Sequence, residues 1–248
     1  MKTAIKILML TVVVSYLIFA VATLSHGNDD KICSGIKIVL SDTTETSYMT
    51  DAYISNIITE KKIFPEGKKL SQININDIET AVRSNPYVDS VICYYTPTGT
   101  ICVKVIPVKP IIHIIAANGQ QYYMDVTGKV LPSSDFDLDL CLATGNITPK
   151  TARTTLLSLA EFLNTHSPWD KEIQQVNVID ENHISLTAVT GNHSIMLGPT
   201  TNLEDKFERL AIFYKEGLDK VGWNKYKEIN LSFADQVVCT RTEPNKKR

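Results

Sequence analysis

The residues of this chain that could carry out catalysis or hold a metal are scattered and match no established catalytic pattern. No histidine is paired with a second metal ligand at the spacing of a known metal motif, and the five histidines lie at positions 26, 113, 166, 183 and 193. The sequence contains no nucleophile elbow (G-x-S-x-G), no H-E-x-x-H, no P-loop and no C-x-x-C. It therefore predicts no enzyme activity, no metal site and no cofactor.

Two stretches resemble binding sites but are better explained as ordinary structure. His113 lies in the apolar run Ile111–Ile115, where we expect a strand histidine with one ring nitrogen bonded to the backbone. Asp135, Asp137 and Asp139 alternate as calcium ligands do, but the glycine and the distal glutamate of a calcium loop are missing. We interpret this acidic cluster as a solvated loop.

Composition excludes further classes of protein. The chain has 248 residues, with 25 Lys and Arg against 27 Asp and Glu, so its net charge is −2. A nucleic-acid binder would show a basic excess, which is absent here. The five cysteines are too few for a disulfide scaffold. The length fits one or two ordinary globular domains.

The N-terminal segment Ile5–Leu24 is apolar, with Lys6 as its only charge. As a helix it would span about 30 Å, the thickness of the hydrocarbon core of a bilayer. Lys2, Lys6 and the terminal amine lie at its N-terminal end and Asp29 and Asp30 follow it, so the positive-inside rule predicts a cytoplasmic N-terminus and an exported body. The segment Ala20–Ala22 also resembles a signal-peptide cleavage site, so a cleaved leader remains the alternative to an anchor. Both interpretations place the body outside the cytoplasm.

A first folded unit is predicted over residues 35–108, after a polar linker at 25–34. Gly35–Leu40 is expected to be a strand. A helix is expected from Thr50, a usable N-cap that is followed by isoleucines at helical spacing. A second helix is expected from Asn76, which has a glutamate three residues later as in a capping box.

Two strands, Val88–Tyr95 and Thr100–Ile106, should form a hairpin around the turn-forming residues 96–99. A symmetric register would place Cys93 opposite Cys102 on one face, at a separation that a disulfide can bridge. Two unbonded, small apolar side chains on a sheet face are the alternative to this candidate disulfide.

The symmetric register also predicts which face of the hairpin packs against the helices. Val91 and Lys104 would share the face of the cysteines, so the opposite face, with Ile92 and Tyr94, is the expected core face. The order strand–helix–helix–strand–strand predicts an α+β unit with both helices on one sheet face.

A second unit is predicted over residues 109–243, because prolines at 107 and 110 suit a domain boundary. Strand-like runs are at 111–116, 121–125, 175–179, 184–188 and 194–197, and helices are expected at 151–166 and from 202. The final run Tyr226–Thr240 has strand character and leads to a basic tail at 244–248.

This order of elements resembles the bacterial cell-division proteins of the FtsQ/DivIB family. Residues 85–88 (Asn-Pro-Tyr-Val) are similar to the N-P-W/Y-V junction of the family. Pro110-Ile111 and residues 122–133 resemble its P-I segment and its Y-Y-x-D-x-x-G-x-x-x-P-S motif, in a version like that of the Bacteroidota. Residues 229–238 resemble the (I/V)-D-L-R-Y-x-x-Q-V-V strand, with Ser232 and Phe233 in place of its Arg and Tyr.

The resemblance implies a fold and a role. The fold is α+β: a cytoplasmic stub and transmembrane helix over residues 1–24, a POTRA domain over 35–108, and a β-rich domain with two or more helices over 109–243. The role is that of a bitopic inner-membrane scaffold at the division septum, with its bulk in the periplasm. Such a scaffold recruits FtsB/FtsL-like partners and regulates septal peptidoglycan synthesis, and has neither a small-molecule substrate nor a nucleic-acid partner.

The docking site that the resemblance implies is the last strand of the β-rich domain. An edge strand can accept a partner strand through its unpaired backbone groups. We expect alternate residues along this edge, Leu231, Phe233, Asp235 and Val237, to meet the partner. The full set of candidate partner-binding residues is Asn230, Leu231, Ser232, Phe233, Ala234, Asp235, Gln236, Val237 and Val238.

Other interpretations stay open at this point. The final segment could complete the sheet core instead of forming an edge. The edge of the POTRA sheet is a second candidate docking surface for division proteins. The chain as a whole could be another exported POTRA-containing module, in envelope assembly or secretion, or an exported enzyme whose scattered polar residues converge in space.

Overall fold

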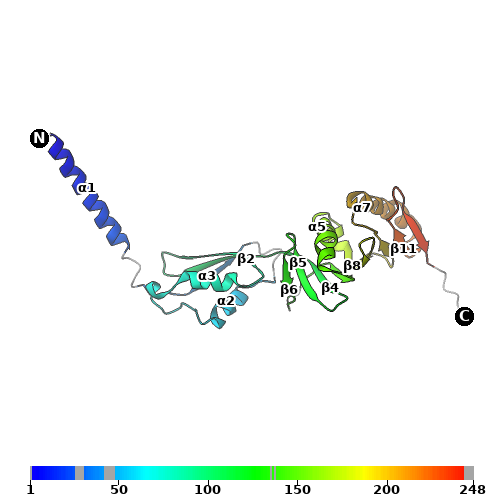
Figure 1. Cartoon of the computed structure of the whole chain (residues 1–248), viewed down its shortest axis with the longest axis horizontal. Coiled ribbons are helices and arrows are strands. Elements are labelled where there is room, and N and C mark those ends of the chain that lie inside the picture. The colour runs from blue at the N-terminus through cyan, green and yellow to red at the C-terminus, as the bar shows by residue number, and fades with distance from the viewer. Residues whose placement is uncertain (1, 26–30, 42–47, 135, 137, 243–248) are drawn as a thin grey trace. The chain divides into compact units, whose positions relative to one another are not determined.

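The structure is a computed structural model of the 248-residue chain, and it describes residues 2–25, 31–41, 48–134, 136 and 138–242. The chain divides into two compact units, residues 1–108 and 109–248 (Figure 1). Linker residues 26–30, the acidic residues Asp135 and Asp137, and the tail at 244–248 lie outside the described residues.

The apolar N-terminal segment forms helix α1, Lys2–Ser25, as its composition predicts. No helix in the described part of the chain is both long and apolar enough to cross a membrane. The transmembrane span over Ile5–Leu24 stays a prediction from the sequence.

The first unit has the predicted order of elements. They are β1 (Ile36–Leu40), α2 (Asp51–Glu60), the 3₁₀-helix η1 (Leu70–Gln72), α3 (Ile75–Arg83), β2 (Val88–Tyr95) and β3 (Ile101–Pro107). The described strands form one sheet in the order β1-β3-β2, in which β1 is parallel and β2 antiparallel to β3. Thr50 caps α2 as predicted. The cap of α3 is Asn74 instead of Asn76, because the Asn74 side chain accepts the Asn76 N–H at 3.1 Å.

The register of the β2–β3 hairpin differs by one residue from the symmetric prediction. Its loop runs from residue 96 to 100, one residue longer than predicted, so Cys93 lies opposite Val103 and Cys102 lies opposite Tyr94. A slip of one residue moves side chains to the other face of a sheet. The two cysteines thus lie on opposite faces and are free, and the candidate Cys93–Cys102 disulfide is not formed.

The same shift corrects the predicted core face of this unit. The face that packs against α2 and α3 carries the buried side chains Val91, Cys93 and Val103. Ile92 and Tyr94, predicted to be in the core, are 61% and 47% exposed on the other face.

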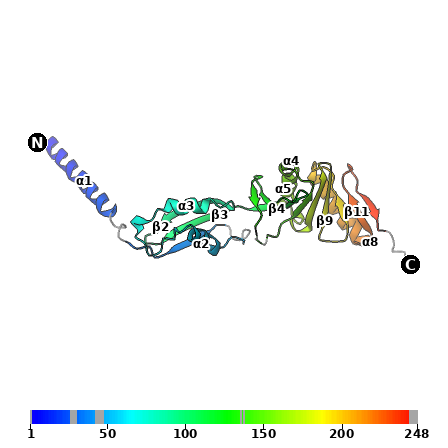
Figure 2. The same cartoon turned by 60° about the horizontal axis from the view of Figure 1, so that its bottom comes forward.

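The second unit contains nine strands among its described residues. They are β4 (Pro110–Ala116), β5 (Gln121–Asp125), β6 (Val130–Pro132), β7 (Leu142–Gly145), β8 (Ile173–Asp180), β9 (His183–Ala188), β10 (Ser194–Met196), β11 (Tyr226–Asn230) and β12 (Val238–Arg241). They form one sheet in the order β12-β11-β10-β9-β8-β7-β4-β5-β6. Figure 2 shows β4, β9 and β11 following one another across this sheet.

Two long helical stretches of the second unit each contain a π-helical segment. The first comprises α4 (Pro149–Thr151), the π-helix η2 (Ala152–Leu156) and α5 (Leu157–Thr165), and the short α6 (Trp169–Glu172) follows it. The second comprises α7 (Leu203–Ile212), the π-helix η3 (Phe213–Leu218) and α8 (Asp219–Val221). Such segments are rare in proteins and frequent at functional sites.

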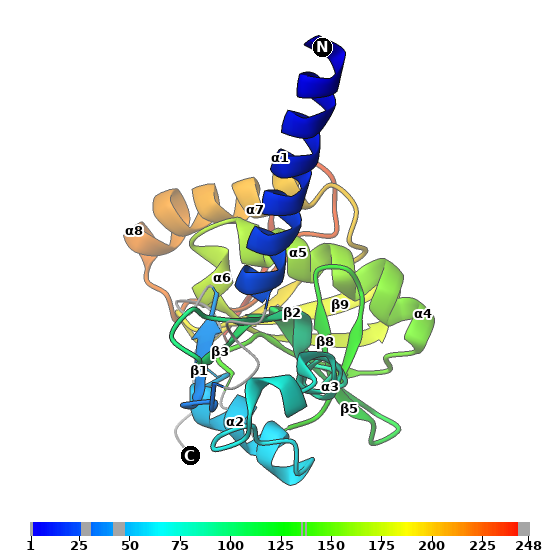
Figure 3. The same cartoon turned by 90° about the vertical axis from the view of Figure 1, so that its left-hand side faces the viewer.

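The helices of the second unit lie on one face of its sheet. Figure 3 shows α5 and α7 on the same side of β8 and β9. Strand β9 accordingly buries Ile184, Leu186 and Ala188 in the core and exposes His183 and Thr187. An antiparallel strand with one buried and one solvated face shows this alternation.

We predict that the folded protein has five free thiols, because the hairpin register separates Cys93 from Cys102. After non-reducing denaturation, Ellman's reagent should titrate all five thiols. In the native state Cys93 should react slowly, because burial, followed by the nearby Glu79 charge, raises the pKa of its thiol to about 11. Recovery of two thiols fewer, restored by prior reduction, would show that a disulfide is present.

Candidate functional site

The predicted final strand Tyr226–Thr240 is a hairpin in the structure. Strand β11 ends at Asn230, a loop covers residues 231–237, and β12 begins at Val238. The Asn230 side chain starts the loop, because its Oδ1 accepts the Ser232 N–H at 2.9 Å in an Asx turn. Asp235 has the left-handed φ of 57°. The candidate partner-binding residues at 231–237 are therefore loop residues, and the predicted alternation along one edge is wrong.

The candidate residues differ greatly in exposure. Leu231 is fully buried in the core, and its N–H donates to the carbonyl of Met196 at 2.8 Å. Phe233 in the loop and Val238 on β12 are 48% and 43% exposed. Leu231 thus follows the alternative interpretation, in which the segment completes the core, whereas Phe233 and Val238 can contact another molecule.

Strand β12 is an open edge in the part of the chain that the structure describes. It pairs antiparallel with β11 on one side and with no strand on the other. Cys239 lies opposite the buried Ile229 and packs against the core, while Val238 lies opposite Asn230. An edge of this kind presents free N–H and C=O groups to a further strand.

The opposite edge of the sheet, β6, is protected. It has three residues and ends in Pro132, which is paired with Tyr122 of β5. Proline cannot donate a backbone hydrogen bond, and short strands with proline are a common way to block an edge. The described part of β12 has no such proline. Of the two edges, β12 is therefore the better acceptor for a partner strand.

Arg209 of α7 fastens the β11–β12 loop to the helical layer. Its guanidinium donates to the carbonyls of Phe233 at 3.0 Å, Gln236 at 2.5 Å and Leu231 at 3.5 Å, and its Nε donates to Asp205 at 3.0 Å. The side chain is only 15% exposed. Sequence reasoning missed this residue: the i, i+4 spacing of Asp205 and Arg209 indicates a helix surface pair and gives no sign of the loop.

Lys206, one helical turn before Leu210, fastens α7 to the neighbouring chain segment. Its ammonium group donates to the carbonyls of Leu197 at 3.0 Å and Pro199 at 2.6 Å, and the residue is buried. Burial, followed by the charge of Arg209, lowers the pKa of Lys206. The two basic residues of α7 thus fix the end of β10 and the β11–β12 loop.

Two of the residues that could do chemistry, His113 and His183, lie beside neighbouring side chains. No group of three His, Cys, Asp or Glu side chains within the described residues could hold a metal ion. His113 stacks on Tyr123 with ring centroids 4.5 Å apart, and burial lowers its pKa. His183 contacts the carboxylate of Asp180 in an exposed turn at 2.8 Å. His183 thus has a polar partner, whereas the buried Nε2 of His113 has no hydrogen-bond partner among the described residues, so the predicted backbone bond is not seen at that nitrogen.

The motif over residues 122–133 forms the β5–β6 hairpin. Asp125 is buried, and its Oδ1 accepts the N–H groups of Thr127 and Lys129, each at 2.9 Å. Gly128 has a φ of 78°, a backbone conformation that favours glycine. The motif therefore shapes a turn.

Comparison of the sequence with known protein families gives two matches. Residues 109–240 match the family described as FtsQ/DivIB, C-terminal related, and residues 31–106 match a POTRA-like domain. No curated protein matches the chain. Because the first match covers more than half of the chain, the chain belongs to the FtsQ/DivIB, C-terminal related family.

Proposed function

We propose that the protein is a non-enzymatic scaffold of the bacterial divisome that captures a partner strand on β12. The observation that carries this proposal is the open β12 edge at the end of a domain of the FtsQ/DivIB, C-terminal related family. The family match supports a role in cell division, and the second match supports a POTRA-like domain. The partner and the mode of capture are the proposal.

The geometry of β12 favours backbone pairing as the mode of capture. A partner strand laid antiparallel or parallel to Val238–Arg241 would complete the hydrogen bonds that β11 leaves unmade. Val238 would contact alternate side chains of that strand on the solvated face of the sheet, and Phe233 lies in the adjoining loop. We propose an FtsB/FtsL-like coiled-coil pair as the partner, through which the scaffold regulates septal peptidoglycan synthesis.

We expect the substitution Val238→Glu to weaken co-purification of a co-expressed FtsB/FtsL-like pair by roughly tenfold, because it places a charge in the contact surface. Val130→Glu is the matched control, since Val130 is also an exposed valine on an edge strand, at the protected end of the sheet. Equal binding by both variants would contradict capture at β12.

Backbone pairing has a direct readout in hydrogen exchange. Amides of residues 238–241 should exchange more slowly once the pair is bound, because a partner strand protects amides of the open edge. Amides of β6 should keep their rate. Protection that appears on β6 or on the POTRA sheet, with β12 unchanged, would move the docking site away from β12.

Arg209 should affect partner binding at β12 through the β11–β12 loop that it holds in place. Arg209→Met removes hydrogen bonds to three loop carbonyls and should lower the free energy of unfolding by about 1.5–3 kcal/mol. It should also speed exchange in residues 231–237 and weaken partner binding. Arg153→Met, at an exposed position of η2, is the control and should change stability by at most about 0.5 kcal/mol. Urea unfolding and hydrogen exchange measure both effects.

From the sequence rather than from the structure, we further propose that the segment Ile5–Leu24 tethers the protein to the inner membrane, with the N-terminus in the cytoplasm and the bulk in the periplasm at the septum. The support is the apolar sequence of Ile5–Leu24 with lysines on its N-terminal side. The full chain should pellet with membranes, be digested by protease in spheroplasts and collect at midcell during constriction. A variant without residues 2–25 should do none of these. A full chain found in the soluble cytoplasmic fraction would contradict the tether.

A further inference from the structure

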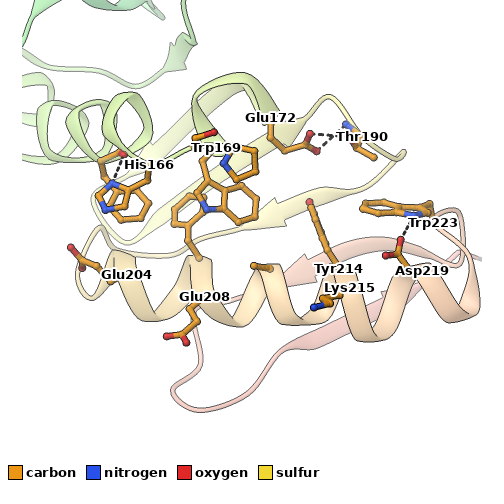
Figure 4. A pocket seen from close by; sticks show the side chains of 15 residues that line it. His166, Trp169, Glu172, Thr190, Glu204, Glu208, Tyr214, Lys215, Asp219 and Trp223 are labelled. Atoms are coloured by element: carbon orange, nitrogen blue, oxygen red, sulfur yellow. Dashed lines mark hydrogen bonds between the residues drawn. The ribbon is translucent and has the colours of Figure 1, made fainter.

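A pocket of about 620 Å³ lies in the helical layer of the second unit, away from the residues of β12. Its walls come from the end of α5, from α6 and from the continuous helix α7–η3–α8 (Figure 4). This volume is within the range of about 300–1,000 Å³ that is typical of ligand-binding clefts. We call it the aromatic pocket, after the side chains that line its floor.

Five aromatic side chains form this floor and pack against one another. Trp169 lies against Phe207 with ring centroids 5.0 Å apart and Tyr214 lies against Trp223 at 4.8 Å, while Phe162 lies 4.9 Å from Phe207. Trp169, Phe207 and Phe162 are buried. Aromatic faces of this kind bind apolar groups and also attract cations.

The rim of the aromatic pocket is acidic. Glu172, Glu204, Glu208 and Asp219 line it, with Lys215 as the only Lys or Arg among its lining residues. Figure 4 shows Glu204 and Glu208 on α7 and Glu172 on the other side of the tryptophan floor. Carboxylates therefore flank the floor from two sides.

Two of these carboxylates are held in place by hydrogen bonds. Glu172 accepts the Thr190 N–H at 3.0 Å and the Thr190 hydroxyl at 2.8 Å, and Asp219 accepts the Trp223 indole N–H at 3.1 Å. Tyr214 and Lys215 lie in the π-helix η3, a type of segment that is frequent at functional sites. The negative charge is thus fixed around an apolar floor.

We propose that the aromatic pocket docks a basic amphipathic segment of a partner protein. An apolar side chain of that segment packs against Trp169 and Trp223, and its Lys or Arg side chains lie beside the carboxylates of Glu172, Glu208 and Asp219. Charge complementarity selects this occupant: an acidic segment would be repelled by the rim, and a neutral one would leave the rim unpaired. The inference does not rest on strand capture at β12, because it concerns residues of the helical layer.

The chain provides its own probe for this proposal. It has two tryptophans, Trp169 and Trp223, and both line the aromatic pocket. Tryptophan emission of the full-length protein can therefore be titrated with an amphipathic Leu/Lys peptide that lacks aromatic residues. We expect a saturable change in emission, and we expect the affinity that it reports to fall as salt is added. Leu/Glu and Leu/Gln peptides of the same pattern should bind at least roughly tenfold more weakly.

Neighbouring positions on α7 offer a matched pair of variants. Ala211 and Ile212 are both exposed, but only Ala211 lines the aromatic pocket. Arginine is nearly as good a helix former as alanine, so Ala211→Arg should fold and fill the pocket with a cation. Ala211→Arg should weaken binding of the Leu/Lys peptide at least roughly tenfold. Ile212→Arg, which adds the same charge, should change that binding by no more than about twofold. Should Ala211→Arg fail to fold, Glu208→Lys replaces it, with Glu60→Lys of α2 as its control.

Three results would overturn the proposal. The first is an emission that the Leu/Lys peptide does not change, or that the Leu/Gln peptide changes equally. The second is an equal loss of binding in the pocket variant and its control. The third is an emission that depends on the concentration of the protein alone, which would make a second copy of the chain the occupant.

Discussion

The arrangement of the C-terminal hairpin depends on one arginine. Arg209 holds three carbonyls of the loop between β11 and β12, and it does so from a helix that packs on the core through Phe207 and Leu210. Strand β12 has only β11 as a neighbour in the described sheet. Arg209 therefore connects the loop before the last strand to a helix that packs on the core, and Lys206 connects the chain at the end of β10 to the same helix.

Much of the fold could be predicted because local signals and global packing agree. The order of elements in the first unit and the helix cap at Thr50 follow from spacing and capping chemistry. The register of the β2–β3 hairpin could not be predicted in this way. A loop that is one residue longer is compatible with the same sequence pattern, but it places Cys93 and Cys102 on opposite faces of the sheet. The alternation of apolar residues along the two strands does not distinguish a loop of four residues from a loop of five.

The candidate site was predictable only in outline. The apolar character of residues 226–240 indicates β structure, but the turn inside it depends on the Asn230 side chain and on the carbonyl contacts of Arg209, which lies more than twenty residues earlier. Leu231 and Phe233 have similar hydrophobicity, yet one is buried and the other exposed. Contacts between distant segments decide such differences, and the aromatic pocket, assembled from several helices, is of the same kind.

The length of β12 limits how firmly the partner strand that we propose could be held. Four residues extend only about 13 Å, and each backbone hydrogen bond adds only about 0.5–1.5 kcal/mol net. A partner strand paired with so short a strand dissociates quickly when this contact acts alone. It stays bound only while other contacts hold the same partner nearby. A reversible attachment of this kind suits the scaffold role that we propose.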